Sequence, residues 1–131
     1  MRKQIQTNKV ATPKSPYSQA IAASGTFVFL SGMVPTDPET GEQRLGTFRE
    51  QAELTFENIG KLLEAAGSSW ENVVKITGYL ADYANFAEWN EVYRKYLKEP
   101  YPARTTLQAG IGKVALEGDV IAIVPEDYEE N

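Results

Sequence analysis

The chain has 131 residues and a formal charge of −5, and it contains neither histidine nor cysteine. These absences exclude a Ser-His-Asp triad, a Cys-His pair, a disulfide and any zinc site built on imidazole or thiolate. Chemistry must therefore come from Arg, Lys, Tyr, Ser, Thr, carboxylates or backbone groups. The length predicts a single domain over residues 1–131.

Charge and hydropathy narrow the class of partner. Residues 1–14 hold four basic residues and no acid, whereas residues 126–131 hold four acids, which we interpret as a solvated end. No basic stripe is present, so we expect no nucleic-acid partner. No apolar run approaches the roughly 18 residues of a membrane span. Since no apolar block follows the N-terminal charges, we expect no secretory signal and a cytoplasmic protein without a membrane partner.

The N-terminal part of the chain predicts strands and loops. Residues 3–6 are expected to form a short strand, and 7–18 an ordered loop that contains two prolines. The apolar stretches 20–23 and 26–31 flank Ser24-Gly25, and this arrangement predicts a β-hairpin between two strands.

A loop rich in turn-forming residues over 32–46 leads to the first predicted helix. Thr47-Phe48-Arg49-Glu50 is a capping-box pattern, and apolar residues then recur at helical spacing. Gly67 supplies a C-terminal stop. The pattern predicts a helix of about 20 residues with one buried stripe.

The second half of the chain alternates strands with one more helix. Residues 73–80 are rich in β-branched side chains and predict a strand. Asn85-Phe86-Ala87-Glu88 is similar to a second capping box, and an aromatic face at helical spacing follows it. Strands over 103–109 and 119–124 complete the order β-β-β-α-β-α-β-β.

This order predicts an α+β fold, a two-layer sandwich in which two helices cover one face of a sheet. The last strand is apolar on both sides, with Val120 and Ala122 one way and Ile121 and Ile123 the other. A sheet that is apolar on both faces, with helices for only one face, needs a second cover. We therefore expect a homo-oligomer.

Arg104 is the candidate ligand-binding residue that emerges from the residues alone. It follows Tyr101-Pro102-Ala103 at the start of a predicted strand, and the next twelve residues contain no acid. A guanidinium binds a carboxylate through two parallel hydrogen bonds. Two interpretations stay open here: a carboxylate ligand, or an ion pair with an acid of another subunit.

Five segments of the chain resemble the RidA/YjgF family of enamine and imine deaminases. They are PYSQA at 16–20, LSGMVP at 30–35, EAAG at 64–67, FAEWN at 86–90 and YPARTT at 101–106. The resemblance covers nearly the whole chain, and its most specific element is the last of these segments. It implies a chorismate-mutase-like fold with a mixed sheet, a homotrimer with ligand clefts between subunits, and no cofactor or metal.

The resemblance also implies an activity, the hydrolysis of 2-enamino or 2-imino acids such as 2-aminoacrylate to 2-keto acids and ammonia. In the implied site, Arg104 has the catalytic role and holds the carboxylate of the small-molecule substrate. The backbone of Leu107 would hydrogen-bond near the reacting atoms. Tyr17, Ser31 and Asn90 would line or brace the cleft.

The last strand departs from the family pattern. Many active members carry a glutamate that orients the attacking water, and a gap-free alignment places Val120 at that point of the substrate-binding cleft. Asp119 is adjacent, but alternation along a strand should turn it to the opposite face. A bulge helped by Gly118 could re-aim Asp119 or Glu117 as the water-orienting acid.

Two alternatives to this deaminase therefore stay open. The first is a deaminase for a larger, aminomuconate-like dicarboxylate, because Val120 and Met33 make the implied pocket less polar. The second is a non-catalytic protein that binds small carboxylates, because the usual glutamate is absent.

Overall fold

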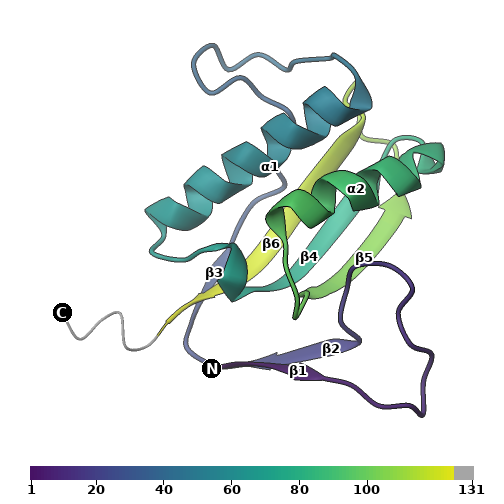
Figure 1. The fold of residues 1–131 in the computed structure, drawn as a ribbon. Helices are drawn as coiled ribbons and strands as arrows, with labels where there is room; N and C mark the ends of the chain where they lie inside the picture. Colours follow the sequence, from purple (N-terminus) through teal and green to yellow (C-terminus); the bar gives the residue numbers. More distant parts are fainter. Residues whose placement is uncertain (126–131) are drawn as a thin grey trace.

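A computed structural model describes residues 1–125 of the chain (Figure 1). The acidic end at 126–131, interpreted above as solvated, lies outside the described residues. Short 3₁₀ helices occupy Trp70–Asn72 and Tyr83–Asn85. The longer elements, in chain order, are β1 (Arg2–Ile5), β2 (Ala20–Ala23), β3 (Thr26–Phe29), α1 (Phe48–Ala65), β4 (Val73–Leu80), α2 (Phe86–Tyr96), β5 (Ala103–Gln108) and β6 (Leu116–Val124).

The predicted capping box at the start of α1 is confirmed. The Thr47 hydroxyl accepts a hydrogen bond from the Glu50 backbone N–H at 3.1 Å, and the Glu50 carboxylate accepts one from the Thr47 N–H at 2.8 Å. Gly67 has a φ of 80°, in the left-handed region that favours glycine after a helix end. Local chemistry therefore fixes both ends of α1.

The prediction of a second capping box is wrong, although α2 does begin at Phe86, as predicted. The Asn85 side chain makes no capping hydrogen bond. Asp82 takes over this task one turn earlier, where its side chain accepts the Ala84 N–H at 2.9 Å. A 3₁₀ turn thus precedes the helix, and the cap belongs to that turn.

The main sheet is mixed, as predicted, with the strand order β3-β6-β4-β5. β4 and β5 run parallel, whereas β6 is antiparallel to both of its neighbours. The predicted hairpin is wrong, because β2 pairs with β1 in a separate ribbon and β3 pairs with β6. Gly25, with a φ of 127°, turns the chain from one sheet into the other. β6 also begins three residues earlier than predicted, at Leu116.

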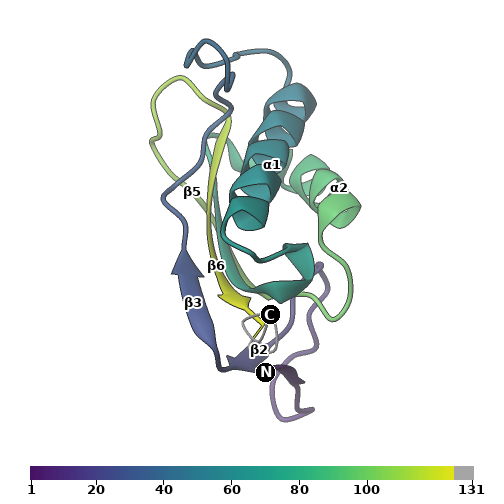
Figure 2. The same cartoon turned by 90° about the vertical axis from the view of Figure 1, so that its left-hand side faces the viewer.

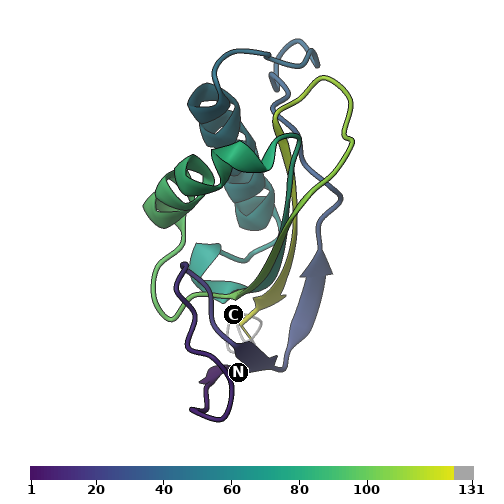
Figure 3. The ribbon, with the colours of Figure 1, turned by 90° about the vertical axis from the view of Figure 1, so that its right-hand side faces the viewer.

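The two-layer architecture is confirmed, since both helices lie on one face of the main sheet (Figures 2 and 3). The core fills the space between these layers, and it includes Ile59 and Leu63 of α1, Trp89 of α2 and Ile76 of β4. No helix within residues 1–125 is long and apolar enough to span a membrane.

The other side of the main sheet, which we call the open face, is not covered by any element of residues 1–125 (Figure 2). Phe29 is 72% exposed there, and the adjacent Phe27 is 41% exposed. Alternation and register place these side chains on the open face: Phe27, Phe29, Lys75, Thr77, Tyr79, Thr105, Leu107, Glu117, Asp119, Ile121 and Ile123.

Candidate functional site

Arg104 projects from the start of β5 toward α2. Its guanidinium Nη1 donates a hydrogen bond to Asn90 Oδ1 of α2 at 2.9 Å. Within residues 1–125, no carboxylate oxygen lies within 4.0 Å of this guanidinium. The chain therefore holds a half-buried cation with an amide partner and, in this part of the molecule, no compensating anion.

Four aromatic rings surround the Arg104 guanidinium, and we call this guanidinium, the four rings and Asn90 the Arg104 cluster. Its Cζ lies 4.9 Å from the ring centroid of Tyr93, 5.5 Å from Tyr17, 5.7 Å from Phe86 and 5.9 Å from Trp89. The electron-rich faces of such rings attract a cation. Burial in this aromatic box lowers the pKa of the Arg104 guanidinium from its usual value. Arginine stays protonated at physiological pH nonetheless, so the box presents a partly desolvated positive charge.

Tyr17 reaches Arg104 because the neighbouring residue ties the N-terminal loop to β5. The Ser18 N–H donates to the Pro102 carbonyl at 3.0 Å, and the Ser18 hydroxyl donates to the Tyr101 carbonyl. On the other side of the cluster, Asn90 Nδ2 lies 3.5 Å from the Ser15 hydroxyl. The structure thus brings together three of the predicted site residues, namely Arg104, Tyr17 and Asn90.

Ser31 lies at the opposite edge of the main sheet. It follows β3, whereas Arg104 is on β5, and two strands separate these edges. Ser31 is exposed and lines a hollow of about 350 Å³ between β3 and α1, together with Phe29 and Leu62. Arg104 and Ser31 therefore do not share a site within one chain.

The two candidate water-orienting acids, Asp119 and Glu117, are on the open face. The Tyr79 hydroxyl donates to Asp119 Oδ2 at 2.7 Å, and this hydrogen bond is the main cause of the raised pKa of Tyr79. Leu107 is on the same face and is 38% exposed. Within residues 1–125, no group of three or more acidic residues is arranged to hold a metal ion.

Val120, which the resemblance places in the substrate-binding cleft, is not accessible to a ligand within one chain. Val120 is 1% exposed and belongs to the core between the sheet and the helices. The prediction of a bulge at Gly118 is wrong, because β6 pairs with β4 in regular register at this residue. The irregularity in this pairing lies between Val73 and Lys75 of β4. Asp119 faces away from Val120 through simple alternation, as expected.

Three of the four rings around Arg104 belong to the aromatic helical face that the sequence predicts for α2. Phe86, Trp89 and Tyr93 recur at intervals of three and four residues, which places them on one side of the helix. Sequence reasoning interprets such a stripe as core. The signal that could identify it as a ligand wall is the arginine without a nearby acid on the strand that this stripe covers.

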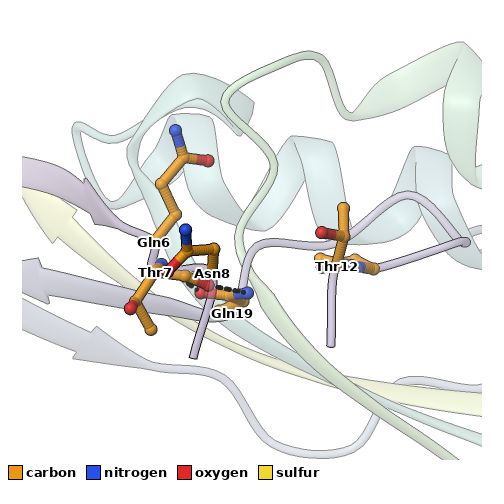
Figure 4. Close-up of a pocket in the computed structure, with 6 residues that line it drawn as sticks. Gln6, Thr7, Asn8, Thr12 and Gln19 are labelled. Carbon is orange, nitrogen blue, oxygen red and sulfur yellow. Dashed lines mark hydrogen bonds between the residues drawn. The ribbon is translucent and has the colours of Figure 1, made fainter. Parts of the chain in front are cut away.

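The N-terminal loop itself forms a hollow, which is lined by residues of 6–13 and by Gln19 (Figure 4). It measures about 430 Å³, and its wall is braced by Gln19, whose side chain bonds the Thr7 backbone at 2.8 and 3.0 Å. A second hollow of about 250 Å³ shares Gln19 with it and extends to Tyr17. The surface next to Tyr17 therefore combines amide and hydroxyl groups with the carboxylate of Glu99.

The chain is similar to known proteins over most of its length. The model of the family described as endoribonuclease L-PSP matches residues 7–124. The chain belongs to this family, the RidA/YjgF family. A RutC family protein of Pyrococcus abyssi is 48% identical over 104 residues, which cover 79% of this chain and 81% of the relative. The human 2-iminobutanoate/2-iminopropanoate deaminase is 39% identical over 108 residues, 82% of this chain and 78% of that protein.

Solved structures of the RidA/YjgF family share the fold. RidA from an Antarctic Psychrobacter is 42% identical, with a TM-score of 0.70 and coverage of 92% of this chain and 98% of that chain. TdcF of E. coli with bound serine is 34% identical, with a TM-score of 0.68 and the same coverages. The fold is therefore that of the family, and one member has been solved with a small amino acid.

Proposed function

We propose that this protein hydrolyses 2-enamino and 2-imino acids of the 2-aminoacrylate type, with the substrate carboxylate bound to Arg104. The observation that carries the proposal is the half-buried guanidinium, which among residues 1–125 has no carboxylate partner. A planar guanidinium matches a carboxylate geometrically, and the two groups attract most strongly where water is excluded. Relatives that are named imine deaminases, and a relative with bound serine, support the same ligand class.

The proposed reaction suits a chain without histidine or cysteine. An enamino acid first takes a proton on carbon and becomes an imine. Water then adds to the imine carbon, and the carbinolamine that forms expels ammonia to leave the 2-keto acid. The protein has to fix the carboxylate and place one water, and orientation of this kind supplies a large part of catalysis.

The proposed site needs a second copy of the chain. Arg104, Tyr17 and Asn90 meet beside β5, while Ser31 is at the opposite edge of the sheet and Asp119 is on the open face. A homotrimer in which the open face and the β3 edge of one subunit meet the β5 edge of the next would join them. In that arrangement Asp119 or Glu117 orients the water.

Three further roles complete the proposal. The backbone of Leu107, on the edge strand β5, hydrogen-bonds the reacting group. Tyr17 and Asn90 hold the guanidinium and border the substrate. Val120 supports the site from the core, where its side chain packs, and does not contact the substrate in this proposal.

The test is the release of keto acid from 2-aminoacrylate or 2-iminobutanoate generated in situ. The protein should accelerate this release, and Arg104→Ala should remove the acceleration. A wild-type protein no faster than Arg104→Ala would defeat the proposal.

A non-catalytic carboxylate-binding protein is the second candidate. It is favoured by the placement of Asp119 and Glu117 on the sheet face opposite Arg104 within one chain. Titration with 2-oxobutanoate that shows binding, together with no turnover of any imine, would support it over the enzyme. A substrate panel with a preference for larger dicarboxylates would instead favour the aminomuconate-like deaminase.

A further inference from the structure

Gly78 occupies the middle of the central strand β4, where a residue without a side chain weakens a sheet. Its φ is not in the left-handed region, so the backbone does not require glycine there. A Cβ at this position would overlap Cζ2 of Trp89 and would lie 2.9 Å from Cη2 and 3.1 Å from Cε2. The indole of Trp89 therefore takes the space that a side chain on β4 would fill.

Two more elements fix the same indole. Trp89 Nε1 donates a hydrogen bond to the Thr106 hydroxyl on β5 at 3.1 Å. The indole stacks on Phe56 of α1, with 5.5 Å between ring centroids and an interplanar angle of 24°. Trp89 is 1% exposed, so water does not compete for these contacts. Contacts from β4, β5 and α1 thus give this side chain a single position.

The fixed indole contacts the residues that hold Arg104. Thr106 is two positions after Arg104, so both side chains point to the helix side of β5. The Trp89 ring lies 5.9 Å from Arg104 Cζ and 5.7 Å from the ring of Tyr93. The side-chain hydrogen bond of the guanidinium goes to a neutral amide and not to a carboxylate that would fix both of its arms. The surrounding rings therefore determine much of its orientation.

We propose that Trp89 is a positioning residue for Arg104. Admitted by Gly78 and anchored by Thr106, it holds the guanidinium in the orientation that meets a carboxylate ligand. This inference rests on the proposed function, because that function supplies the carboxylate. It adds Trp89, Gly78 and Thr106 to the residues that determine ligand affinity.

Three substitutions test the proposal through KM and kcat. Thr106→Val keeps the side-chain shape but leaves the indole N–H buried without its acceptor, and Trp89→Phe removes that donor and part of the ring. Both should raise KM by about tenfold and leave kcat within about twofold, because ligand binding weakens while the water-placing groups stay intact. Gly78→Ala should act in the same direction and more strongly, because it displaces the indole.

The double variant Gly78→Ala/Trp89→Phe supplies a rescue. The smaller phenyl ring makes room for the new methyl group, so part of the affinity that Gly78→Ala loses should return. A double variant that binds more weakly than both single variants would contradict the proposed packing.

The chain offers a matched control in a second glycine–tryptophan contact. A Cβ on Gly60 of α1 would lie 3.1 Å from Trp70 Nε1, and Trp70 also packs on the Phe56 ring at 5.7 Å. Trp70 is not among the rings around Arg104. Gly60→Ala and Trp70→Phe should therefore lower stability without changing KM.

A readout without turnover separates this inference from the proposed function. We would record the Arg104 Nε–H signal by NMR of arginine-labelled protein and titrate 2-oxobutanoate by calorimetry. Thr106→Val and Trp89→Phe should shift the Arg104 signal and weaken binding by about tenfold, whereas Trp70→Phe should do neither.

The outcomes are distinct. Folded Thr106→Val protein with an unchanged Arg104 signal and unchanged 2-oxobutanoate affinity would overturn the inference even if imines are hydrolysed. A wild-type protein that neither binds 2-oxobutanoate nor hydrolyses imines would overturn the proposed function, while the NMR signal would still decide whether Trp89 positions Arg104.

Discussion

Two arginines of this chain lie in contrasting environments, and the contrast supports the ligand-binding role proposed for one of them. Arg49 donates to Glu88 at 3.1 Å and to Glu91 at 2.5 Å, and these carboxylates raise the pKa of its guanidinium. Burial lowers the pKa of Arg104, which has four rings and the Asn90 amide around it. The charge of Arg49 is paired between α1 and α2, whereas Arg104 has no carboxylate within 4.0 Å among residues 1–125.

Tyr93 carries a prediction at the same scale, because its buried hydroxyl has no hydrogen-bond partner within the described residues. Burial raises the pKa of this phenol, so it stays neutral at physiological pH. An unsatisfied buried polar group costs about 1–3 kcal/mol, and Tyr93→Phe removes the group while keeping the ring. The free energy of unfolding in a denaturant titration should therefore rise by about 1 kcal/mol.

Tyr79→Phe is the matched control for Tyr93→Phe. It removes a hydroxyl that does have a partner, Asp119, so it should lower the free energy of unfolding by up to about 1 kcal/mol. If Tyr93→Phe destabilised the protein as much as Tyr79→Phe does, a hidden partner of the Tyr93 hydroxyl would have to exist.

At the scale of elements, the sequence predicts structure well where local chemistry decides it. The bounds of β4 and the start of α1 follow from β-branched residues and the capping box at Thr47, and both are confirmed. The hairpin around Ser24-Gly25 is wrong because a turn-forming dipeptide does not say which strands pair. The pairing of β3 with β6 is a contact between residues about a hundred positions apart.

In the candidate site, too, the sequence predicts what short motifs decide and misses what depends on contacts between distant residues. Arg104, Tyr17 and Asn90 belong to short motifs, and the structure brings them together. The role of Trp89 depends on a space in β4 at Gly78, and no local pattern on α2 reveals that space. Sequence periodicity therefore places the ring on the correct helical face and leaves its contact with Arg104 unseen.

The two helix starts offer a test of capping. Thr47→Ala removes the hydroxyl that accepts the Glu50 N–H, while the backbone N–H that donates to the Glu50 carboxylate stays, and it should lower the free energy of unfolding by about 1 kcal/mol, as N-cap substitutions do. Asn85→Ala changes the same kind of position in α2, where the side chain makes no capping bond, and should cost clearly less. Equal losses in thermal or denaturant unfolding would show that the geometry at Asn85 differs from that described.

For the whole molecule, the open face is the surface on which the proposed assembly depends. The sequence predicts apolar residues on both sides of β6, and the structure adds Phe27 and Phe29 of β3, which pair with Ile123 and Ile121 on that face. Ile123 is already buried, but exposed aromatic side chains such as Phe27 and Phe29 are typical of an interface. The proposed site is divided between two edges of the sheet, so the same interface would also complete it.

Phe29→Lys joins assembly to activity in one measurement. A charge at the centre of an apolar interface opposes its burial, so the variant should sediment as a smaller species than the wild type at micromolar concentration. Its keto-acid release should fall to the level of Arg104→Ala, because Arg104 would lose the groups that the neighbouring subunit supplies. Leu45→Lys, at an equally apolar, 51% exposed position on the loop before α1, should change neither property. A Phe29→Lys monomer with full activity would show that the whole site lies within one chain. A wild-type protein that sediments as a monomer would contradict the proposed homotrimer.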